Sequence, residues 1–284
     1  MLFVALGILT RSLFNPLSHW RLKGRSMEVI SERINGLFTS VMKAIDARDE
    51  KFIQDLAVNQ VDAGANILDI NTGPGVENAP EIMTWLVKTV QDAVDVKLSV
   101  DTPKMDAMKA GVEAAANKVL INSTTAEAEK MSVLFPMAAE HGSDIICLTL
   151  DEKGIPNDAN SRCELAMIMV AQAMEHGIDT TKVYLDPLIL PVGAAQDQGP
   201  KVLEALSMFK AIADPAPKTV VGLSNVSNNT KERSLLNRTY LAMLLANGLD
   251  AAIMDPNDGE LMAIAKASEV LLNHTLYADD FLRA

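Results

Sequence analysis

The chain has 284 residues, 49% apolar and 4% aromatic, which suffices for one large α/β domain or two small ones. Its 37 acidic residues outnumber its 25 Lys and Arg residues, for a formal net charge of −12. Because an evenly acidic chain is a poor partner for nucleic acid or an anionic membrane surface, we expect neither partner. Cys147 and Cys163 lack metal-ligand spacing and are typical of reduced thiols in a cytoplasmic protein.

The first 26 residues differ in character from the rest. An apolar run, LFVALGIL, is followed by basic residues, whereas a signal peptide carries its positive charge before the apolar run. The run is also too short to span a bilayer. We therefore expect residues 1–26 to be an N-terminal extension, which either precedes a true start at Met27 or is held loosely.

From Met27 onward, short runs typical of buried strands alternate with helical windows. The predicted strands cover residues 28–34, 66–70, 96–100, 118–121, 144–150, 182–185, 219–223 and 250–254. Clear amphipathic helices are predicted at 50–62 and 234–247. Glycines at 64, 142, 177 and 248 each follow a helix and precede a strand, as expected of left-handed helix caps. Eight such units predict a single (β/α)₈ TIM barrel over residues 27–284, and a doubly wound sheet would show fewer strands.

Each predicted strand ends in an Asn or Asp residue. These residues are Asn35, Asn71, Asp101, Asn122, Asp151, Asp186, Asn225 and Asp255. Such side chains commonly cap the following helix, and this explanation suffices for some of them. It is weaker at Asp101, where Thr102-Pro103 already supplies a cap, and at Asn122, where Thr124 and Glu127 form a predicted capping box. A loop without a helix follows Asp186. We therefore predict that these three side chains are free to bind a ligand where the strand ends converge.

Carboxylate and amide groups in this arrangement suit a flat heterocycle that has N–H and NH₂ donors beside a carbonyl, such as a pterin or guanine. A phosphorylated sugar would favour glycine-rich loops and cations after the last two strands, and those loops carry Asn225, Asn228, Asp255 and Asp258 instead. The four histidines lie away from the strand ends, which argues against a histidine base or a bound metal. Nucleophile-elbow, P-loop and dinucleotide motifs are also missing from the sequence.

Five motifs in order carry a family resemblance. They are ERING at 32–36, SVDT at 99–102, INST at 121–124, LDPLILP at 185–191 and GLSNVS at 222–227. Together they resemble the methyltetrahydrofolate:corrinoid protein methyltransferases, a family of pterin-binding barrels that includes the folate module of cobalamin-dependent methionine synthase. The resemblance extends from about Met27 to near Phe281, which is almost the whole chain.

The resemblance implies roles for particular residues. Asp101, Asn122 and Asp186 would hydrogen-bond the pterin ring, and Asn225 would be the mobile, catalytic asparagine that reaches N5. Four further residues would lie around the same site, namely Glu32, Gly222, Asn228 and Arg233. At Asn228 the sequence departs from the glutamine expected in the family, so its shorter amide puts a direct contact in doubt.

The resemblance also implies the reaction. A methyl group would move between N5 of tetrahydrofolate, or 5-methyltetrahydrofolate, and the cobalt of a corrinoid. The D-x-H-x-x-G motif of corrinoid carriers is missing, so the corrinoid would belong to a separate protein. The direction stays open between methylating the corrinoid and forming methyltetrahydrofolate during growth on methylated amines. Family resemblance further suggests a homodimer.

Two alternatives stay open. A dihydropteroate synthase would share the pterin-binding residues but would carry basic residues after the last strand, where this chain has MDPND at 254–258. A non-catalytic pterin-binding protein would need the ring-binding residues alone, so the presence of Asn225 argues mildly against it.

Overall fold

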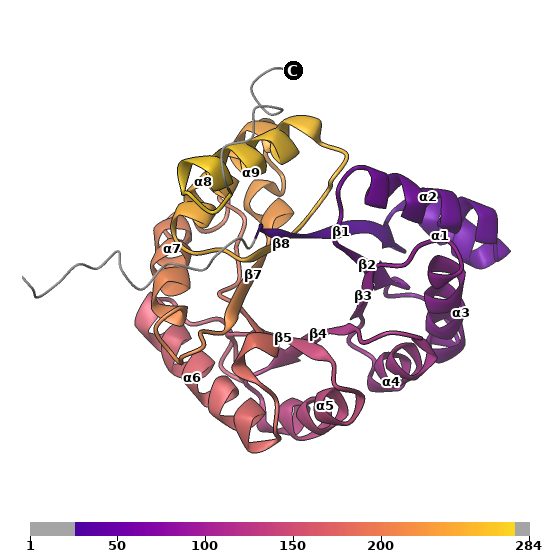
Figure 1. The fold of residues 1–284 in the computed structure, drawn as a ribbon, viewed down its shortest axis with the longest axis horizontal. Coiled ribbons are helices and arrows are strands. Elements are labelled where there is room, and N and C mark those ends of the chain that lie inside the picture. The colour runs from indigo at the N-terminus through magenta and orange to yellow at the C-terminus, as the bar shows by residue number, and fades with distance from the viewer. Residues whose placement is uncertain (1–25, 276–284) are drawn as a thin grey trace, which may run out of the picture.

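The structure, a computed structural model, describes residues 26–275. Within this range the strands form one closed parallel barrel in sequence order, β1 to β8 (Figure 1). Their bounds are β1 Glu28–Asn35, β2 Ile67–Asn71, β3 Lys97–Asp101, β4 Leu120–Thr125, β5 Asp144–Leu148, β6 Val183–Asp186, β7 Lys218–Gly222 and β8 Ala251–Met254. The prediction of a (β/α)₈ barrel is therefore confirmed. The predicted extension at 1–26 lies, except for Ser26, outside the described residues.

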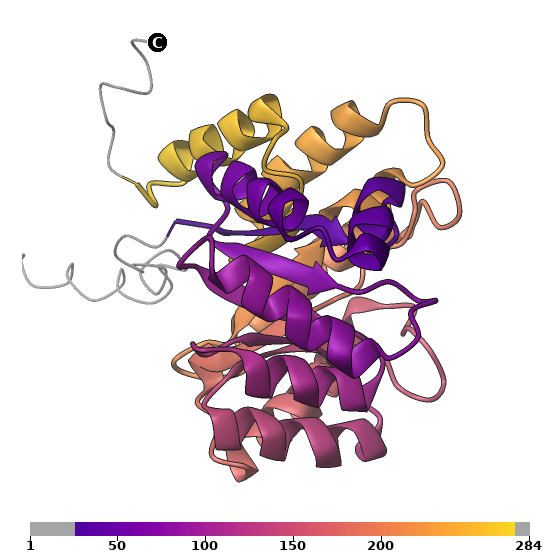
Figure 2. The same ribbon diagram turned by 90° about the vertical axis from the view of Figure 1, so that its right-hand side faces the viewer.

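Helices form a ring outside the barrel (Figures 1 and 2). They are α1 Thr39–Ala47, α2 Glu50–Asp62, α3 Ala79–Gln91, α4 Met105–Ala114, α5 Ala128–His141, α6 Ala159–Glu175, α7 Gln198–Phe209, α8 Arg233–Ala246 and α9 Gly259–Leu271. Two short 3₁₀ turns are η1 Thr180–Lys182 and η2 Leu223–Ser227. Each helix buries one side, as Ile53 and Ala57 of α2 do, so the packing of apolar stripes onto the strands fixes the ring.

The four helix-to-strand turns contain the left-handed glycines that the sequence predicted. All four glycines expected at these turns adopt positive φ, with values of 105°, 62°, 79° and 94° at residues 64, 142, 177 and 248. A side chain at such a position would cost about 1–2 kcal/mol, since the left-handed conformation brings Cβ against the carbonyl oxygen. The repeated glycine therefore marks where one β/α unit ends and the next begins.

Two predicted helix starts are wrong. Thr124 is buried within β4, which continues to Thr125, and α5 begins only after Glu127 without a side-chain cap. The helix after β3 begins at Met105 rather than directly after Thr102-Pro103. In both cases the strand or its turn extends further than the sequence suggested, because the tertiary pairing of neighbouring strands outweighs a local capping motif.

An apolar layer fills the middle of the barrel. Its buried members are Ile30, Ile67, Leu120, Ile146, Tyr184, Val220 and Ala251, one from each strand except β3. Successive side chains of a strand point to opposite faces, so the residue two positions further on also points into the barrel. The interior is thus a packed plug, and the side chains above it define the carboxyl end of the barrel.

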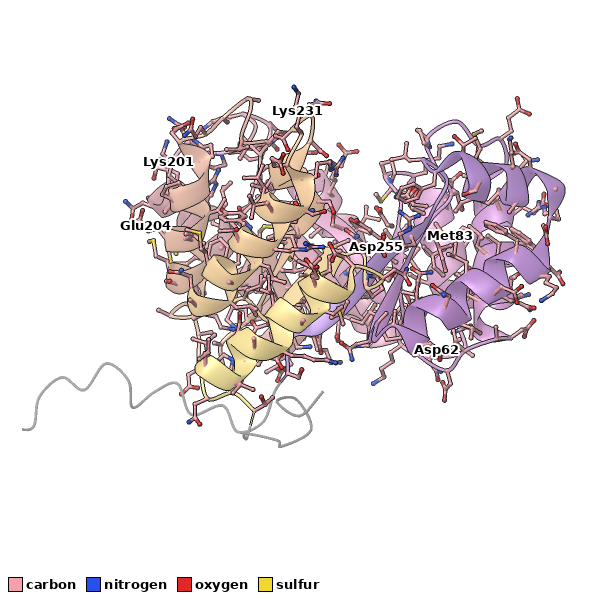
Figure 3. The ribbon with its side chains drawn as sticks, turned by 90° about the horizontal axis from the view of Figure 1, so that it is seen from above. Asp62, Met83, Lys201, Glu204, Lys231 and Asp255 are labelled. Carbon is pink, nitrogen blue, oxygen red and sulfur yellow. The ribbon has the colours of Figure 1, made fainter. Side chains whose placement is uncertain are left out.

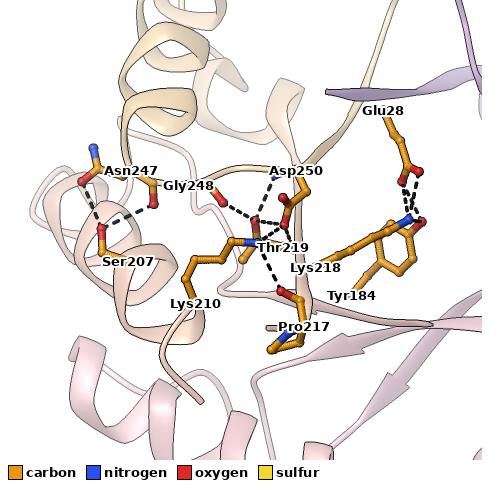
Figure 4. Close-up of polar contacts among 10 residues, drawn as sticks. All are labelled: Glu28, Tyr184, Ser207, Lys210, Pro217, Lys218, Thr219, Asn247, Gly248 and Asp250. Atoms are coloured by element: carbon orange, nitrogen blue, oxygen red, sulfur yellow. Dashed lines mark hydrogen bonds and ion pairs between the residues drawn. The ribbon is translucent and has the colours of Figure 1, made fainter. Parts of the chain in front are cut away.

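Charged groups close the opposite, amino end of the barrel (Figure 4). Lys218 Nζ lies 2.9 Å from both carboxylate oxygens of Glu28, and the Tyr184 hydroxyl donates to Glu28 Oε2 at 2.6 Å. Beside them, Lys210 pairs with Asp250, whose Oδ2 accepts from the Thr219 backbone N–H at 2.7 Å. These bonds join β1, β6, β7 and β8 below the apolar layer.

Two further findings bear on the predictions about composition. Cys147 and Cys163 are free and buried. Within residues 26–275, no helix combines the length and the apolar character needed to cross a membrane.

Candidate functional site

Polar side chains sit directly above the apolar layer, at the carboxyl end of the strands. Glu32, Asp69, Asn122, Asp186 and Gly222 each come two residues after a member of that layer. In the view across the barrel axis, Lys231, which follows β7, marks this end, and Asp62, at the end of α2, marks the other (Figure 3). The strand register therefore brings carboxyl and amide groups from β1, β2, β4 and β6 into one interior ring, with Gly222 of β7 beside them.

Asp101, Asn71, Asn122 and Asp69 form a cluster on β2, β3 and β4. Asn71 Nδ2 donates to Asp101 Oδ2 at 2.6 Å, and Asn122 Nδ2 donates to Asp69 Oδ1 at 3.1 Å. Burial raises the pKa of Asp101, and the Asn71 amide opposes that rise by bonding the ionised form. The predicted ring-binding residues Asp101 and Asn122 are thus brought together and held by neighbours.

Asp186 lies across the barrel, at the end of β6, and is only 6% exposed. Its Oδ1 accepts from the backbone N–H of Leu188 at 2.7 Å, and Leu188 has a φ of 67°, which is strained for a non-glycine residue. Burial raises the pKa of Asp186 to about 7, while the Leu188 N–H and the nearby charge of Arg162 partly offset the rise. The loop after β6 is therefore shaped around this carboxyl group, and its second oxygen forms no hydrogen bond within the described residues.

Asn225 is exposed on η2, directly after β7. A Cβ at Gly222 would lie 2.8 Å from Asn225 Nδ2, so the amide rests over the glycine at the end of the strand. Part of the loop expected after β7 is a 3₁₀ turn, and α8 begins at Arg233, one residue before the helix predicted at 234–247. The turn carries Asn225 on a short, defined piece of backbone.

Glu32 is largely buried beside this turn. Ser224 Oγ donates to Glu32 Oε1 at 2.7 Å, which links the end of β1 to η2. Burial raises the pKa of Glu32, the Ser224 hydrogen bond lowers it, and the charge of Asp255 raises it further. Arg33 lies 3.6 Å from Asp255 and stacks over Phe38, so its charge is held at the rim.

The other predicted residues divide into two groups. Asn228 and Arg233 lie at the end of η2 and the start of α8, near Asn225 in the chain, and their side chains show no hydrogen bond or ion pair within the described residues. Asn35, Asp151 and Asp255 accept from backbone N–H groups two residues further on, at 2.9, 2.9 and 3.0 Å. These three side chains stabilise their own turns and do not cap the following helices, so the capping explanation is wrong for them; α6 and α9 are capped by Asp158 and Asp258 instead.

Two buried residues of this region were not predicted. Asp69 lies inside β2, where only strand ends were considered, although a carboxylate within the apolar run NILDI is itself a signal. Arg162 of α6 is fully buried; its Nη2 donates to Gln198 Oε1 at 2.7 Å, while Nε and Nη1 have no partner among the described residues. Its position on a helix outside the barrel gave no such signal.

We also searched the described residues for metal-ligating clusters and for cavities away from the carboxyl end of the barrel. In the part of the chain described, no three His, Cys, Asp or Glu side chains gather as a metal ion would require. A cavity of about 370 Å³ lies at the amino end, lined by residues such as Met27, Lys210 and Leu249. Because barrel enzymes place their chemistry at the carboxyl end, the ring around Asp101, Asp186 and Asn225 is the candidate site.

The chain is similar to known proteins along most of its length. The model of the pterin binding enzyme family matches residues 32–255. A methylcorrinoid:tetrahydrofolate methyltransferase of Eubacterium limosum is 31% identical over 252 residues, which cover 87% of this chain and 92% of that protein. The methionine synthase of Mycobacterium leprae is 26% identical over 242 residues, and the chain spans about a fifth of its length, 20%.

Solved structures share the fold. The dihydropteroate synthase of Xanthomonas albilineans, with 4-aminobenzoic acid, superposes with a TM-score of 0.64 at 16% identity and covers 88% of this chain and 93% of its own. That of Thermus thermophilus gives a TM-score of 0.62 at 17% identity, with coverages of 90% and 95%. At such low identity these likenesses concern the barrel alone.

The family model matches most of the barrel, from residue 32 to residue 255, so the chain belongs to the pterin-binding enzymes. Within it, the similarity along nearly the whole of the Eubacterium limosum protein confirms the resemblance to the tetrahydrofolate and corrinoid methyltransferases seen in the sequence motifs.

Proposed function

We propose that this protein is a methyltransferase that moves a methyl group between N5 of tetrahydrofolate and the cobalt of a corrinoid. The observation that carries the proposal is the 31% identity to a methylcorrinoid:tetrahydrofolate methyltransferase over 87% of this chain. The ring of Asp101, Asn122 and Asp186 supports it, because these side chains match the donors and acceptors of a pterin.

In this proposal the two carboxylates bind the edges of the pterin ring. Asp186 has one oxygen bonded to the Leu188 N–H, and its other oxygen accepts from the ring. Asp101 is oriented by Asn71 and accepts from an N–H and NH₂ pair, since a carboxylate accepts two parallel hydrogen bonds. Asn122 supplies an amide oxygen while its Nδ2 is bonded to Asp69. Glu32, Gly222, Asn228 and Arg233 surround the N5 side.

Asn225 acts at N5. In transfer to folate, the N5 lone pair attacks the methyl carbon, the carbon–cobalt bond breaks, and both its electrons stay on cobalt, which becomes Co(I). The N5 centre then carries a positive charge until its proton leaves. Both directions pass through one transition state, in which N5 carries its hydrogen and a partial positive charge. The Asn225 amide oxygen accepts from that N5–H and so stabilises the charge. An amide does not release its proton, so Asn225 is not the general acid.

The corrinoid is proposed to arrive on a separate carrier protein that docks over the carboxyl end of the barrel. The exposed positions of Asn225 and Arg233 on η2 and α8 suit this, because they face outward at that end. A cytoplasmic location and a homodimer packed through barrel helices are further parts of the proposal and rest on the family resemblance.

For the direction, we propose transfer from methylcorrinoid to tetrahydrofolate. The name of the Eubacterium limosum relative, which is matched over 92% of its length, supports this direction. Dihydropteroate synthase is the less favoured function. Its structures match at 16% or 17% identity, and here the residues after β8 are acidic, with Asp255 beside Arg33.

An optical assay tests the proposal. Purified protein is mixed anaerobically with methylcob(III)alamin and tetrahydrofolate, and separately with cob(I)alamin and 5-methyltetrahydrofolate, while the cobalt spectrum is followed. We expect enzyme-dependent formation of Co(I) in the first mixture. A faster reaction in the second mixture would reverse the proposed direction. Inactivity in both, also with a corrinoid carrier protein added, would contradict a methyltransferase.

A further inference from the structure

Asp69 is a buried carboxyl group that has no positively charged partner in the described part of the chain. It lies in the middle of β2, is 3% exposed, and forms no ion pair within the described residues. Asn122 Nδ2 donates to its Oδ1 at 3.1 Å, and the neighbouring Ser99 hydroxyl also favours its ionised form. Both of these neighbours are neutral. A carboxylate buried in this way is costly unless it is paired or neutral.

The nearest titratable group is a second carboxyl group. Asp101 lies on the adjacent strand, where Asn71 of β2 pairs with Asp101 and Asp69 pairs with Ser99. The two carboxyl groups lie within hydrogen-bonding reach of each other. Burial raises the pKa of Asp69 well above its ordinary value, and the charge of Asp101 raises it further. Two touching carboxylates in such a site do not both ionise near neutral pH.

The surrounding bonds decide which of the two holds the proton. Asp101 is the more exposed and accepts from Asn71 at 2.6 Å, which favours its ionised form. A hydrogen bond from Asp69 lowers the pKa of Asp101 as well. Asp69 is deeper, and the Asn122 amide occupies its Oδ1, which leaves Oδ2 to carry a hydrogen. The arrangement thus matches a neutral Asp69 that donates to an ionised Asp101.

We propose that Asp69 is a positioning residue of the folate site, whose protonated carboxyl group donates to Asp101 and keeps Asp101 as the carboxylate that the pterin ring binds. The inference rests on the proposed function. It adds to that function an explanation of how two neighbouring carboxyl groups present a single negative charge. That charge lies on Asp101, which is oriented toward the N–H and NH₂ donors of the pterin. Asp69 also fixes Asn122, so it acts on two of the ring-binding residues.

The proposal predicts a limit on binding at alkaline pH. Once Asp69 loses its proton, its negative charge repels that of Asp101. Glu32 on β1 and Asp186 on β6, which belong to the same interior ring, are also acidic and supply no positive charge. Asn122 from β4, Asn71 and Ser99 are neutral and do not offset this. Asp101 then loses the hydrogen bond that Asp69 donated, and the affinity for 5-methyltetrahydrofolate falls.

The test compares the pH dependence of 5-methyltetrahydrofolate dissociation constants for wild type, Asp69→Asn and Asp69→Leu, with Asp95→Asn as an exposed control. The amide that Asp69→Asn introduces cannot ionise, yet it can donate to Asp101 and accept from Asn122. We expect Asp69→Asn to lose the alkaline limb and Asp69→Leu to bind about tenfold or more weakly at every pH, because Asp101 and Asn122 lose a buried partner. Circular dichroism shows whether each variant is folded.

A second measurement does not depend on folate. The infrared difference spectrum between unliganded wild type and Asp69→Asn near neutral pH should show a protonated carboxyl band that wild type has and Asp69→Asn lacks. If the band is the same in both, or if Asp69→Asn keeps the wild-type alkaline limb, the proposal is wrong. If wild type binds no 5-methyltetrahydrofolate, the proposed function fails, while the infrared comparison still decides where the proton lies.

Discussion

The side-chain amide of Asn225 rests directly on Gly222, where a Cβ would come within 2.8 Å of Asn225 Nδ2. The glycine ends β7, and the 3₁₀ turn η2 begins at the next residue. A residue with a side chain would therefore occupy the place of the amide. The Asn225 amide can therefore take up this position only because residue 222 has no side chain.

We predict that Gly222→Ala impairs methyl transfer by moving the Asn225 amide. Because Asp101 and Asp186 are untouched, affinity for 5-methyltetrahydrofolate should change less than turnover does. Gly259→Ala is the matched control, since nothing lies within 4 Å of a Cβ at that position. Equal turnover in both variants, measured with methylcob(III)alamin and tetrahydrofolate, would show that the contact is unimportant.

Asn225→Ala should lower the rate of methyl transfer by about 10²-fold, a typical result of removing one group that stabilises transition-state charge. Folate binding should weaken less, because the ring contacts lie on other strands. Stopped-flow measurement of Co(I) formation under single turnover separates the two effects. Asn59→Ala, on the exposed side of α2, serves as the control. Wild-type rates in Asn225→Ala would remove this residue from the mechanism.

Binding of 5-methyltetrahydrofolate should weaken as pH falls through about 7, the value to which burial raises the pKa of Asp186. The ring donors need the ionised carboxylate, which is present above this pH and lost below it. Titration calorimetry between pH 5.5 and 8.5 measures this limb. Asp186→Asn should bind weakly at every pH and show no such limb, whereas an unchanged limb in that variant would assign it to another group.

Asp186 should also lower the stability of the unliganded protein at neutral and alkaline pH. Folding raises its pKa from about 3.8 to about 7, so the folded protein holds this proton more tightly than the unfolded chain does. The free energy of unfolding is therefore highest below pH 4 and decreases as the pH rises through 7. Asp186→Asn should therefore raise the free energy of unfolding at pH 8 by roughly 2–4 kcal/mol, and the gain should vanish near pH 4. Denaturant unfolding at both pH values checks this; a gain that persists at pH 4 would have another cause.

Lys218→Met should destabilise the barrel without altering the site. The change removes the Lys218 ammonium, which is one of the partners of Glu28 beneath the apolar layer, and breaking a partly buried ion pair costs roughly 2–4 kcal/mol. Thermal unfolding of Lys218→Met and of the exposed Lys51→Met provides the comparison. A melting temperature equal to that of Lys51→Met would show that Glu28 is compensated elsewhere.

Much of the fold follows from the sequence because the pattern repeats. Short strand-like runs of four to seven residues predicted every strand of the barrel in the correct order. Helix starts were harder to predict. Thr124 and Glu127 have capping-box spacing, but pairing of β4 with β5 keeps Thr124 in the strand. A local motif does not reveal that competition.

The site was predictable as far as it depends on strand ends. Asp101, Asn122 and Asp186 all lie in the interior ring, as their positions suggested. Asp69 was missed because it precedes the end of its strand, and depth within a barrel is set by the register between neighbours, which one strand does not encode. The contact of Asn225 with Gly222 depends on a 3₁₀ turn, and the polar sequence of this segment does not distinguish such a turn from an irregular loop.

The hydrogen bonds and ion pairs at the amino end of the barrel affect how the chain folds during its synthesis. Glu28 is bonded to Tyr184 and Lys218, which are 156 and 190 residues away, so the first strand gains these partners only after most of the chain has left the ribosome. Contacts of such separation form late and slow the search for the native state. Until β8 emerges, β1 and β7 are open edges that can pair with another nascent chain. We therefore expect a chaperone that shields strand edges to raise the yield of this barrel more than one that acts after release.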